Sequence, residues 1–159
     1  MAGVEFKDFS VKVKGEINEN IKRFLYEAAE EIVSEAKRNS EVDNGETKNS
    51  YQYKVDIDNR VAVVGSNAVN AIYEEFGTGE YALNHDGRKS AWYIPVSEYH
   101  GRKKPTYQGK VVVVYGKEGK QFFKTDGKKP RRPLFKAFSS KSGSLKRRMS
   151  EIMKEVNDK

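Results

Sequence analysis

The stretch EINENIKRFLYEAAEEIVSEAKR, residues 16–38, carries the strongest structural signal in the sequence. Its apolar residues recur every three or four positions, with Glu, Lys, Arg and Asn between them. This spacing matches the 3.6-residue period of an α-helix with one buried face. We therefore predict an amphipathic helix over residues 16–38, about 35 Å long at 1.5 Å per residue. The predicted buried face consists of Ile17, Ile21, Phe24, Leu25, Ala28, Ala29, Ile32, Val33 and Ala36.

Two pairs of β-prone stretches follow the helix. Residues 51–57 alternate polar and apolar, Asp58-Asn59 suits a tight turn, and residues 60–65 provide the returning strand. Residues 110–115 and 121–125 form a second such pair around a glycine-containing loop. We therefore predict two β-hairpins.

Other segments complete the predicted fold. Residues 67–76 suit a short helix, residues 91–94 a short strand that Pro95 ends, and a C-terminal helix is predicted from the spacing of Leu145 to Val156. The order helix, hairpin, hairpin, helix predicts an α+β fold. In it, the long N-terminal helix and the C-terminal helix pack on an antiparallel sheet of about four strands built from the two hairpins.

The chain is expected to form a single domain over residues 1–159, because this length is typical of one domain. Residues 1–14 are predicted as a flexible arm and residues 80–109 as a long loop region. Charged residues make up 33% of the chain and the mean hydropathy is −0.83. The predicted core is therefore small, and charged loops are expected to become ordered in a complex.

The net charge is +7, and most of the Lys and Arg excess lies between residues 88 and 148. Such a balance favours anionic partners, whether nucleic acid, an acidic protein surface or anionic lipid. No apolar run reaches the roughly 20 residues of a membrane span, and no signal peptide is visible at the start. A soluble protein made in the cytoplasm is expected.

Several kinds of active site find no support in the residue pattern. The chain has no cysteine, which excludes disulfides, thiolate zinc sites and a cysteine nucleophile. His85 and His100 lie in hydrophilic segments without the spacing of zinc ligands, and no serine lies in a Gly-x-Ser-x-Gly motif. We expect no catalytic residue, no metal and no cofactor, and therefore no enzyme.

Two short motifs have a structural interpretation. Glu74 and Glu75 are adjacent, so they point about 100° apart on a helix and are interpreted as solvated charges. The segment Gly77-Thr78-Gly79 lacks the third glycine of a dinucleotide-binding loop. Its glycines are expected to let the chain turn sharply after Phe76.

Basic segments at residues 87–89, 101–104, 128–132 and 146–148 alternate with aromatic residues. This arrangement keeps nucleic-acid binding through phosphate contacts open as a function. The aromatic residues lie mostly in strand patterns, where core packing is their usual role. Docking of the charges onto acidic neighbours, or onto a channel that contains DNA, is the favoured interpretation.

Four local patterns, in this order, resemble the tail-component family of long-tailed phages. The segment VDNGETKNS at residues 42–50 is similar to the family's Val-Asp-Thr-Gly-x-Leu-Lys-x-Ser stretch, with Asn44 and Thr47 as departures and Glu41 where proline is common. The segment EFGTG at residues 75–79 matches the family's signature. The other two patterns are a Gly-Arg-Lys segment before an aromatic pair, at residues 87–93, and a basic Pro-Arg-Arg-Pro-Leu-Phe-Lys-Ala box, at residues 130–137.

The resemblance extends over residues 16–157 and implies a structural virion protein of a phage or prophage. Such a protein completes the tail and joins it to the head, as a neck ring of copies for which a hexamer is expected. Its partners would be other tail and head-connector proteins, with contact to genomic DNA in the channel and no membrane. The interface residues expected from these motifs are Tyr73, Glu75, Phe76, Gly77, Thr78, Gly79, Arg88, Trp92, Pro130, Arg131, Arg132, Pro133 and Phe135.

Two alternatives remain open at this point. The first is a basic nucleic-acid-binding protein, which would bind duplexes with a steep salt dependence. The second is a small hydrolase or toxin-like ribonuclease that works with Arg, Lys, Tyr and Glu. Hydrolysis of RNA by the purified chain would support this second alternative.

Overall fold

The computed structural model describes residues 19–40, 45–99 and 112–157 of the 159-residue chain. Predictions for the arm at 1–14, for residues 100–109 of the loop region and for the basic segment at 101–104 lie outside these residues. So do His100 and residues 42–44 of the first family motif. Along the chain the structure contains α1 (Glu19–Asn39), α2 (Glu46–Asn49), β1 (Tyr51–Asp56), β2 (Val61–Ser66), α3 (Val69–Phe76), β3 (Trp92–Pro95), β4 (Val112–Tyr115), β5 (Gln121–Thr125) and α4 (Pro133–Asn157).

The chain divides into two compact units. Within the described residues, the first contains α1, β1, β2 and α4. The second contains α3 and the strands β3, β4 and β5. The expectation of a single domain stays a prediction.

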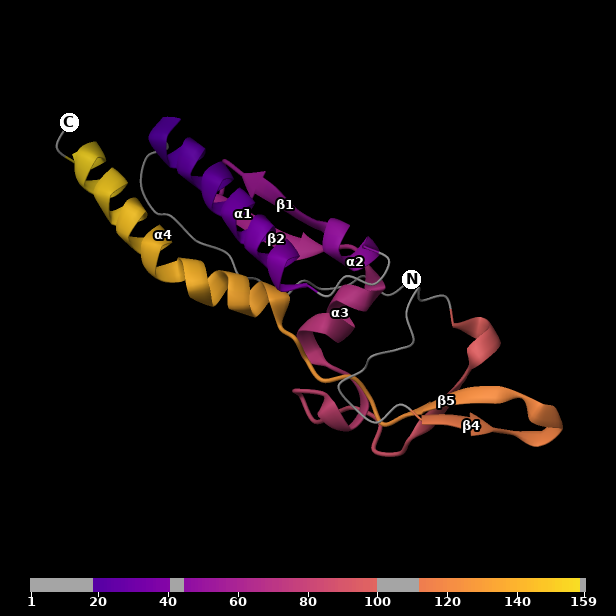
Figure 1. Ribbon diagram of the computed structural model, residues 1–159. Helices are drawn as coiled ribbons and strands as arrows, with labels where there is room; N and C mark the ends of the chain where they lie inside the picture. Colours follow the sequence, from indigo (N-terminus) through magenta and orange to yellow (C-terminus); the bar gives the residue numbers. More distant parts are fainter. Residues whose placement is uncertain (1–18, 41–44, 100–111, 158–159) are drawn as a thin grey trace. The chain divides into compact units, whose positions relative to one another are not determined.

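Helix α1 is the centre of the first unit. All eight predicted core residues from Ile21 to Ala36 are buried, as the periodicity predicted. The helix packs on the β1–β2 hairpin and alongside α4 (Figure 1). From the hairpin, Tyr53 donates a hydrogen bond to Glu30 (2.9 Å) and its ring meets that of Tyr26 edge-on. The hydrogen bond to Glu30 raises the pKa of Tyr53.

Strand β1 alternates between packed and exposed side chains, as predicted for residues 51–57. Tyr51, Tyr53 and Val55 of β1 lie opposite Ser66, Val64 and Ala62 of β2. Tyr51, Val64 and Ala62 join the core around α1. At the turn, the Asn59 side chain and backbone donate to the Asp56 carboxylate, which lowers the pKa of Asp56. Arg60 adopts a left-handed φ of 57° within this turn, so the returning strand begins one residue later than predicted.

The second unit contains a three-stranded antiparallel sheet in the order β3-β5-β4. The β4–β5 hairpin was predicted, and β3 pairs with β5 on its other side, with Trp92 opposite Thr125 and Ile94 opposite Phe123. The α+β class, the terminal helices and the antiparallel hairpins are therefore confirmed. The strands are divided between a two-stranded and a three-stranded sheet instead of forming one sheet.

Helix α4 begins at Pro133, twelve residues before the segment from which it was predicted. Proline suits the first helical position because its missing N–H has no intrahelical partner there and its φ is already helical. Pro133 is therefore the first residue of a 25-residue helix. Ala137 and Leu145 of α4 join the core of the first unit.

Candidate protein-docking surface on α3

Helix α3 ends at a glycine that the local geometry requires. Gly77 has a φ of 73°, and its N–H donates to the Tyr73 carbonyl (3.0 Å). A Cβ added at Gly77 would lie 2.8 Å from the carbonyl oxygens of Lys128 and Tyr81 and from Cδ of Pro130. A side chain here would therefore be strained both by its backbone conformation and by its neighbours.

The chain after α3 is bonded to a segment about 50 residues further on. The Thr78 N–H donates to the Lys128 carbonyl (2.9 Å), and the Lys128 N–H donates to the Thr78 hydroxyl (2.9 Å). The Glu80 N–H donates to the Asp126 carbonyl (2.9 Å). The chain after α3 is thus held against residues 126–128 by two main-chain hydrogen bonds and one to the Thr78 side chain.

Three further glycines allow this close approach. A Cβ at Gly79 would lie 2.1 Å from the Asp126 carbonyl oxygen, and one at Gly127 would lie 2.1 Å from the Thr78 carbonyl oxygen. Gly87 approaches the Gly79 carbonyl equally closely. The predicted turn after Phe76 is confirmed, and the glycines also permit backbone to pack directly on backbone.

Glu74 anchors the basic segment that follows. Its carboxylate forms an ion pair with the Lys128 ammonium, and both side chains are mostly buried. Its main-chain carbonyl accepts hydrogen bonds from the N–H groups of Arg131 (2.8 Å) and Arg132 (3.1 Å). Glu74 and Glu75 are each only 5% exposed, so the interpretation of these carboxylates as solvated charges is wrong. The cation paired with Glu74, Lys128, lies 54 residues away in the sequence.

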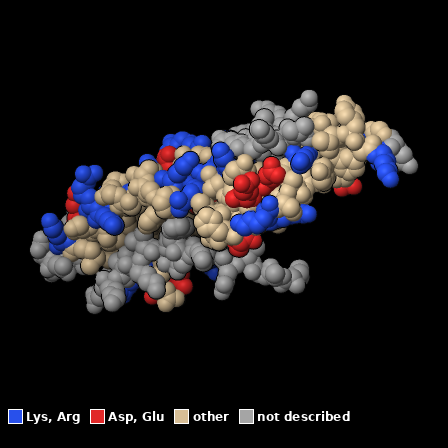
Figure 2. Space-filling model, turned by 90° about the horizontal axis from the view of Figure 1, so that it is seen from below, with Lys and Arg blue, Asp and Glu red and all other residues tan. Residues whose placement is uncertain are grey.

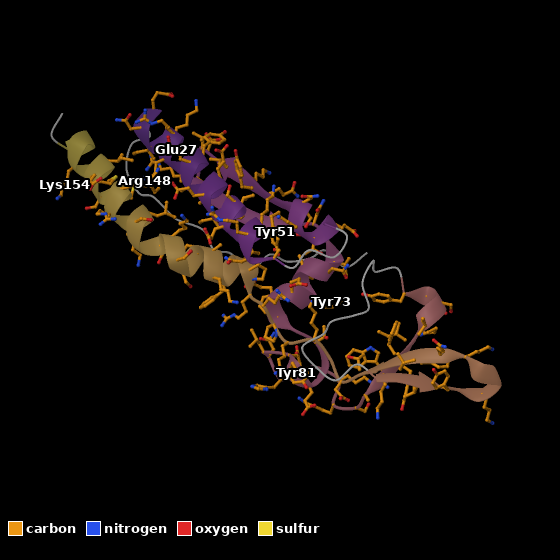
Figure 3. All side chains as sticks on the ribbon, in the orientation of Figure 1. Glu27, Tyr51, Tyr73, Tyr81, Arg148 and Lys154 are labelled. Carbon is orange, nitrogen blue, oxygen red and sulfur yellow. The ribbon has the colours of Figure 1, made fainter. Side chains whose placement is uncertain are left out.

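The burial of α3 is inverted relative to an ordinary surface helix. Its two glutamates and Ala71 face inward, while Val69, Ile72 and Tyr73 are 63%, 37% and 44% exposed. These three residues follow the i, i+3, i+4 spacing of a single helix face, and Tyr73 projects from α3 in Figure 3. We call Val69, Ile72 and Tyr73 the α3 apolar stripe. Apolar side chains grouped outward on a helix typically mark a protein-interaction site.

The structure brings together most of the residues expected at the interface. Gly77, Thr78, Gly79, Pro130, Arg131 and Arg132 meet at the end of α3, and the Trp92 ring lies against Gly79. Phe76 is half-buried, and Arg88 is exposed and donates to Ser90 (3.1 Å). Pro133 and Phe135 belong instead to the first turn of α4, in the other unit.

Of the three residues of the α3 apolar stripe, sequence reasoning placed only Tyr73 at an interface. Val69 and Ile72 were assigned to a helix but not to an interface, and Lys128 was interpreted as one member of a basic loop. The sequence feature that could have indicated this surface was the pair Glu74-Glu75, which lies opposite an apolar stripe on the same short helix. That pattern does not by itself tell which face is buried.

No group of three or more His, Asp or Glu side chains in residues 19–40, 45–99 and 112–157 is arranged to hold a metal ion. Among the same described helices, none is long and apolar enough to cross a membrane.

Comparison with known proteins gave one match. No curated protein and no solved structure matches this chain. A family model matches from the predicted N-terminal arm through α1, β1, β2 and α3, and ends at Gly77. The motifs at residues 87–93 and 130–137 lie outside the match, so their resemblance stays a prediction. Residues 5–77 match the family described as "Bacteriophage HK97-gp10, putative tail-component", which confirms the resemblance to phage tail components over this span.

Proposed function

We propose that this protein is a structural virion component that completes a phage tail and joins it to the head. The observation that carries the proposal is the α3 apolar stripe, which is exposed although the helix behind it is firmly anchored. The family match supports a role in the tail and includes the whole of α3.

The stripe has the properties of a protein-docking surface. An aromatic and two aliphatic side chains lie on one helix face, and aromatic residues commonly dominate binding energy at interfaces. The Glu74–Lys128 ion pair and the interlocked glycines hold α3 in place. A surface that is already ordered loses less conformational freedom on binding.

In the particle, copies of the chain would form a ring at the head-proximal end of the tail. A ring requires a heterologous interface that closes on itself, in which one patch on each copy meets a different patch on the next. The resemblance implies six copies. The α3 apolar stripe supplies one such patch, or the contact with the tail or head connector.

The test is complementation of a phage or prophage whose copy of this gene is disrupted. Without the protein, we expect DNA-filled heads and separate tails in electron micrographs, and the wild-type chain should restore joined particles. The variant Ile72→Asp should not restore them, because a desolvated carboxylate would disrupt an apolar interface. Asn70→Asp is the matched control, since it adds the same charge at another exposed position of α3.

Two results would contradict the proposal. Normal infectious particles from the disrupted phage would exclude a role in joining. Equal rescue by Ile72→Asp and wild type would exclude the α3 apolar stripe as the docking surface. Circular dichroism of both variants checks that each remains folded.

A further inference from the structure

Two cations of α4 are paired with α1. Arg148 bonds to Glu27 (2.7 Å) and to Glu31, and Lys141 lies 4.0 Å from Glu35. In Figure 3 the Arg148 side chain lies between the two helices, next to Glu27. These cations therefore hold α4 against the acidic side of α1.

The remaining cations of α4 lie on its opposite, exposed side. In the described parts of the chain, none of them forms an ion pair with an acidic residue. Figure 3 shows Lys154 on the outer side of α4, away from α1, and in Figure 2 Lys and Arg side chains recur over the part of the molecule that carries α4. We call the exposed polar face of α4 the α4 outer stripe: Lys136, Ser139, Ser140, Gly143, Lys146, Arg147, Ser150 and Lys154.

The stripe is continuous along the helix. Its members recur every three or four residues, with adjacent pairs at 139–140 and 146–147, so they share one face. From Lys136 to Lys154 the stripe extends about 27 Å at 1.5 Å per residue. Glu151, at its margin, is the one exposed acidic residue of α4 among the side chains that the structure describes.

The composition of the stripe fits a phosphate backbone. Lys, Arg and Ser side chains are among the usual donors to DNA phosphates. Gly143 lies at the centre of the stripe, and a Cβ added there would meet nothing within 4 Å. Because glycine weakens a helix relative to alanine, the fold itself gives no reason for glycine at this position. Glycine does allow a ligand to approach the helix backbone closely.

An acidic protein and a membrane surface fit less well. Protein interfaces are depleted in Lys and have aromatic or aliphatic residues at their centre, whereas the stripe contains neither. A helix that binds a membrane inserts an apolar face, but Ala137 and Leu145 on the apolar side of α4 are buried in the core. Four cations on one helix face, interspersed with serines and a glycine and without an apolar member, fit the phosphates of a nucleic acid better.

We propose that the α4 outer stripe binds duplex DNA through its phosphate backbone, without reading the base sequence. As a contact inside the virus particle, this rests on the proposed tail function, where the stripe would touch DNA passing between head and tail. DNA binding by the purified chain is a separate property and is tested separately.

The test is fluorescence anisotropy of the full chain with labelled duplexes of about 20 base pairs, longer than the stripe, over about 50 to 200 mM salt. We expect binding that is equal for unrelated sequences and falls steeply with salt. The variant Lys146→Gln/Arg147→Gln/Lys154→Gln should bind about tenfold more weakly at the middle of this range, and its log–log salt slope should be smaller by about three, one for each lost phosphate contact.

The matched control is Lys54→Gln/Lys89→Gln/Lys117→Gln. It removes the same charge from exposed positions off the stripe, so a loss of binding through net charge alone would appear equally in both variants. No duplex binding by the wild type, or equal effects of the two triple variants, would overturn the proposal. Polyglutamate is the second probe, and stripe-dependent binding of polyglutamate that exceeds duplex binding would assign the surface to an acidic protein.

The outcome is independent of the joining assay. If the stripe variant binds duplexes as the wild type does while particles still require the protein, only the DNA proposal fails. If particles form without the protein while the stripe still binds duplexes, only the proposed tail function fails.

Discussion

A position can require glycine because of its backbone conformation or because a side chain would clash, and Gly79 and Gly119 differ in the second respect. Both have a left-handed φ, 61° and 71° respectively. A Cβ at Gly79 would also lie 2.1 Å from the Asp126 carbonyl oxygen, whereas one at Gly119 would meet nothing within 4 Å. The first position therefore combines backbone strain with a steric clash, and the second has backbone strain alone.

We predict that Gly79→Ala lowers the free energy of unfolding by about 3 kcal/mol or more, because strain and overpacking add. Gly119→Ala should lower it by only about 1 kcal/mol, the usual cost of a left-handed conformation for alanine. Urea unfolding followed by the fluorescence of Trp92, the single tryptophan, measures both values, since its ring lies against Gly79. Equal losses in the two variants would show that residues 126–128 can move aside.

At the scale of elements, the Glu74–Lys128 ion pair joins α3 to the segment that follows β5. Glu74 is almost fully enclosed, and its Oε2 has no hydrogen-bond partner in the described part of the chain. Glu74 therefore depends strongly on Lys128, because removing one partner of a buried pair leaves an uncompensated charge.

We predict that Lys128→Met lowers the free energy of unfolding by about 3 kcal/mol. The double variant Glu74→Met/Lys128→Met should lose much less, since two apolar side chains can replace a buried ion pair. Lys22→Met is the control: it breaks an exposed pair with Glu19 and should change stability by less than about 1 kcal/mol. The single variant Glu74→Met completes the comparison. If the double variant lost as much stability as Glu74→Met and Lys128→Met together, a direct coupling of the two residues would be contradicted.

The elements differ in how far local sequence predicts them. Helix α1 and its buried residues were both predicted, because the helical spacing of its apolar residues identifies the face that packs on the core. The same reasoning applied to α3 predicted a helix but not its orientation. Its Glu74 is paired with Lys128, and the chain at its end is packed against Asp126 and Gly127; all three partners are distant in the sequence.

Strand pairing and helix starts show the same limit. The β4–β5 hairpin follows from a short loop, but the pairing of β3 with β5 joins residues about 30 positions apart. The C-terminal helix was predicted only from Leu145 onward, yet α4 starts at Pro133, and its residues Ala137 and Leu145 both join the core around α1. The pairing of β3 with β5 and the start of α4 both depend on packing between residues far apart in the sequence. Such packing cannot be predicted from a local sequence pattern.

At the scale of the whole molecule, the two proposed surfaces belong to different units of the chain. The α3 apolar stripe lies in the second unit, anchored by Glu74 and Lys128, and the α4 outer stripe lies in the first, on a helix held by Arg148 and Lys141. Neither set of anchoring contacts includes a residue of the other stripe. Substitutions at the two surfaces should therefore be additive, as is usual for sites without shared partners.

We predict that the two surfaces can be inactivated separately. Ile72→Asp should abolish rescue of joined particles while its duplex affinity stays within about twofold of wild type, because the cations of α4 are unchanged. Lys146→Gln/Arg147→Gln/Lys154→Gln should bind duplexes about tenfold more weakly and still form joined particles, with any defect appearing later, in release of DNA. Micrographs, anisotropy and infectivity of the two variants separate these outcomes. Loss of both properties in either variant, with the fold intact by circular dichroism, would mean that one surface serves both partners.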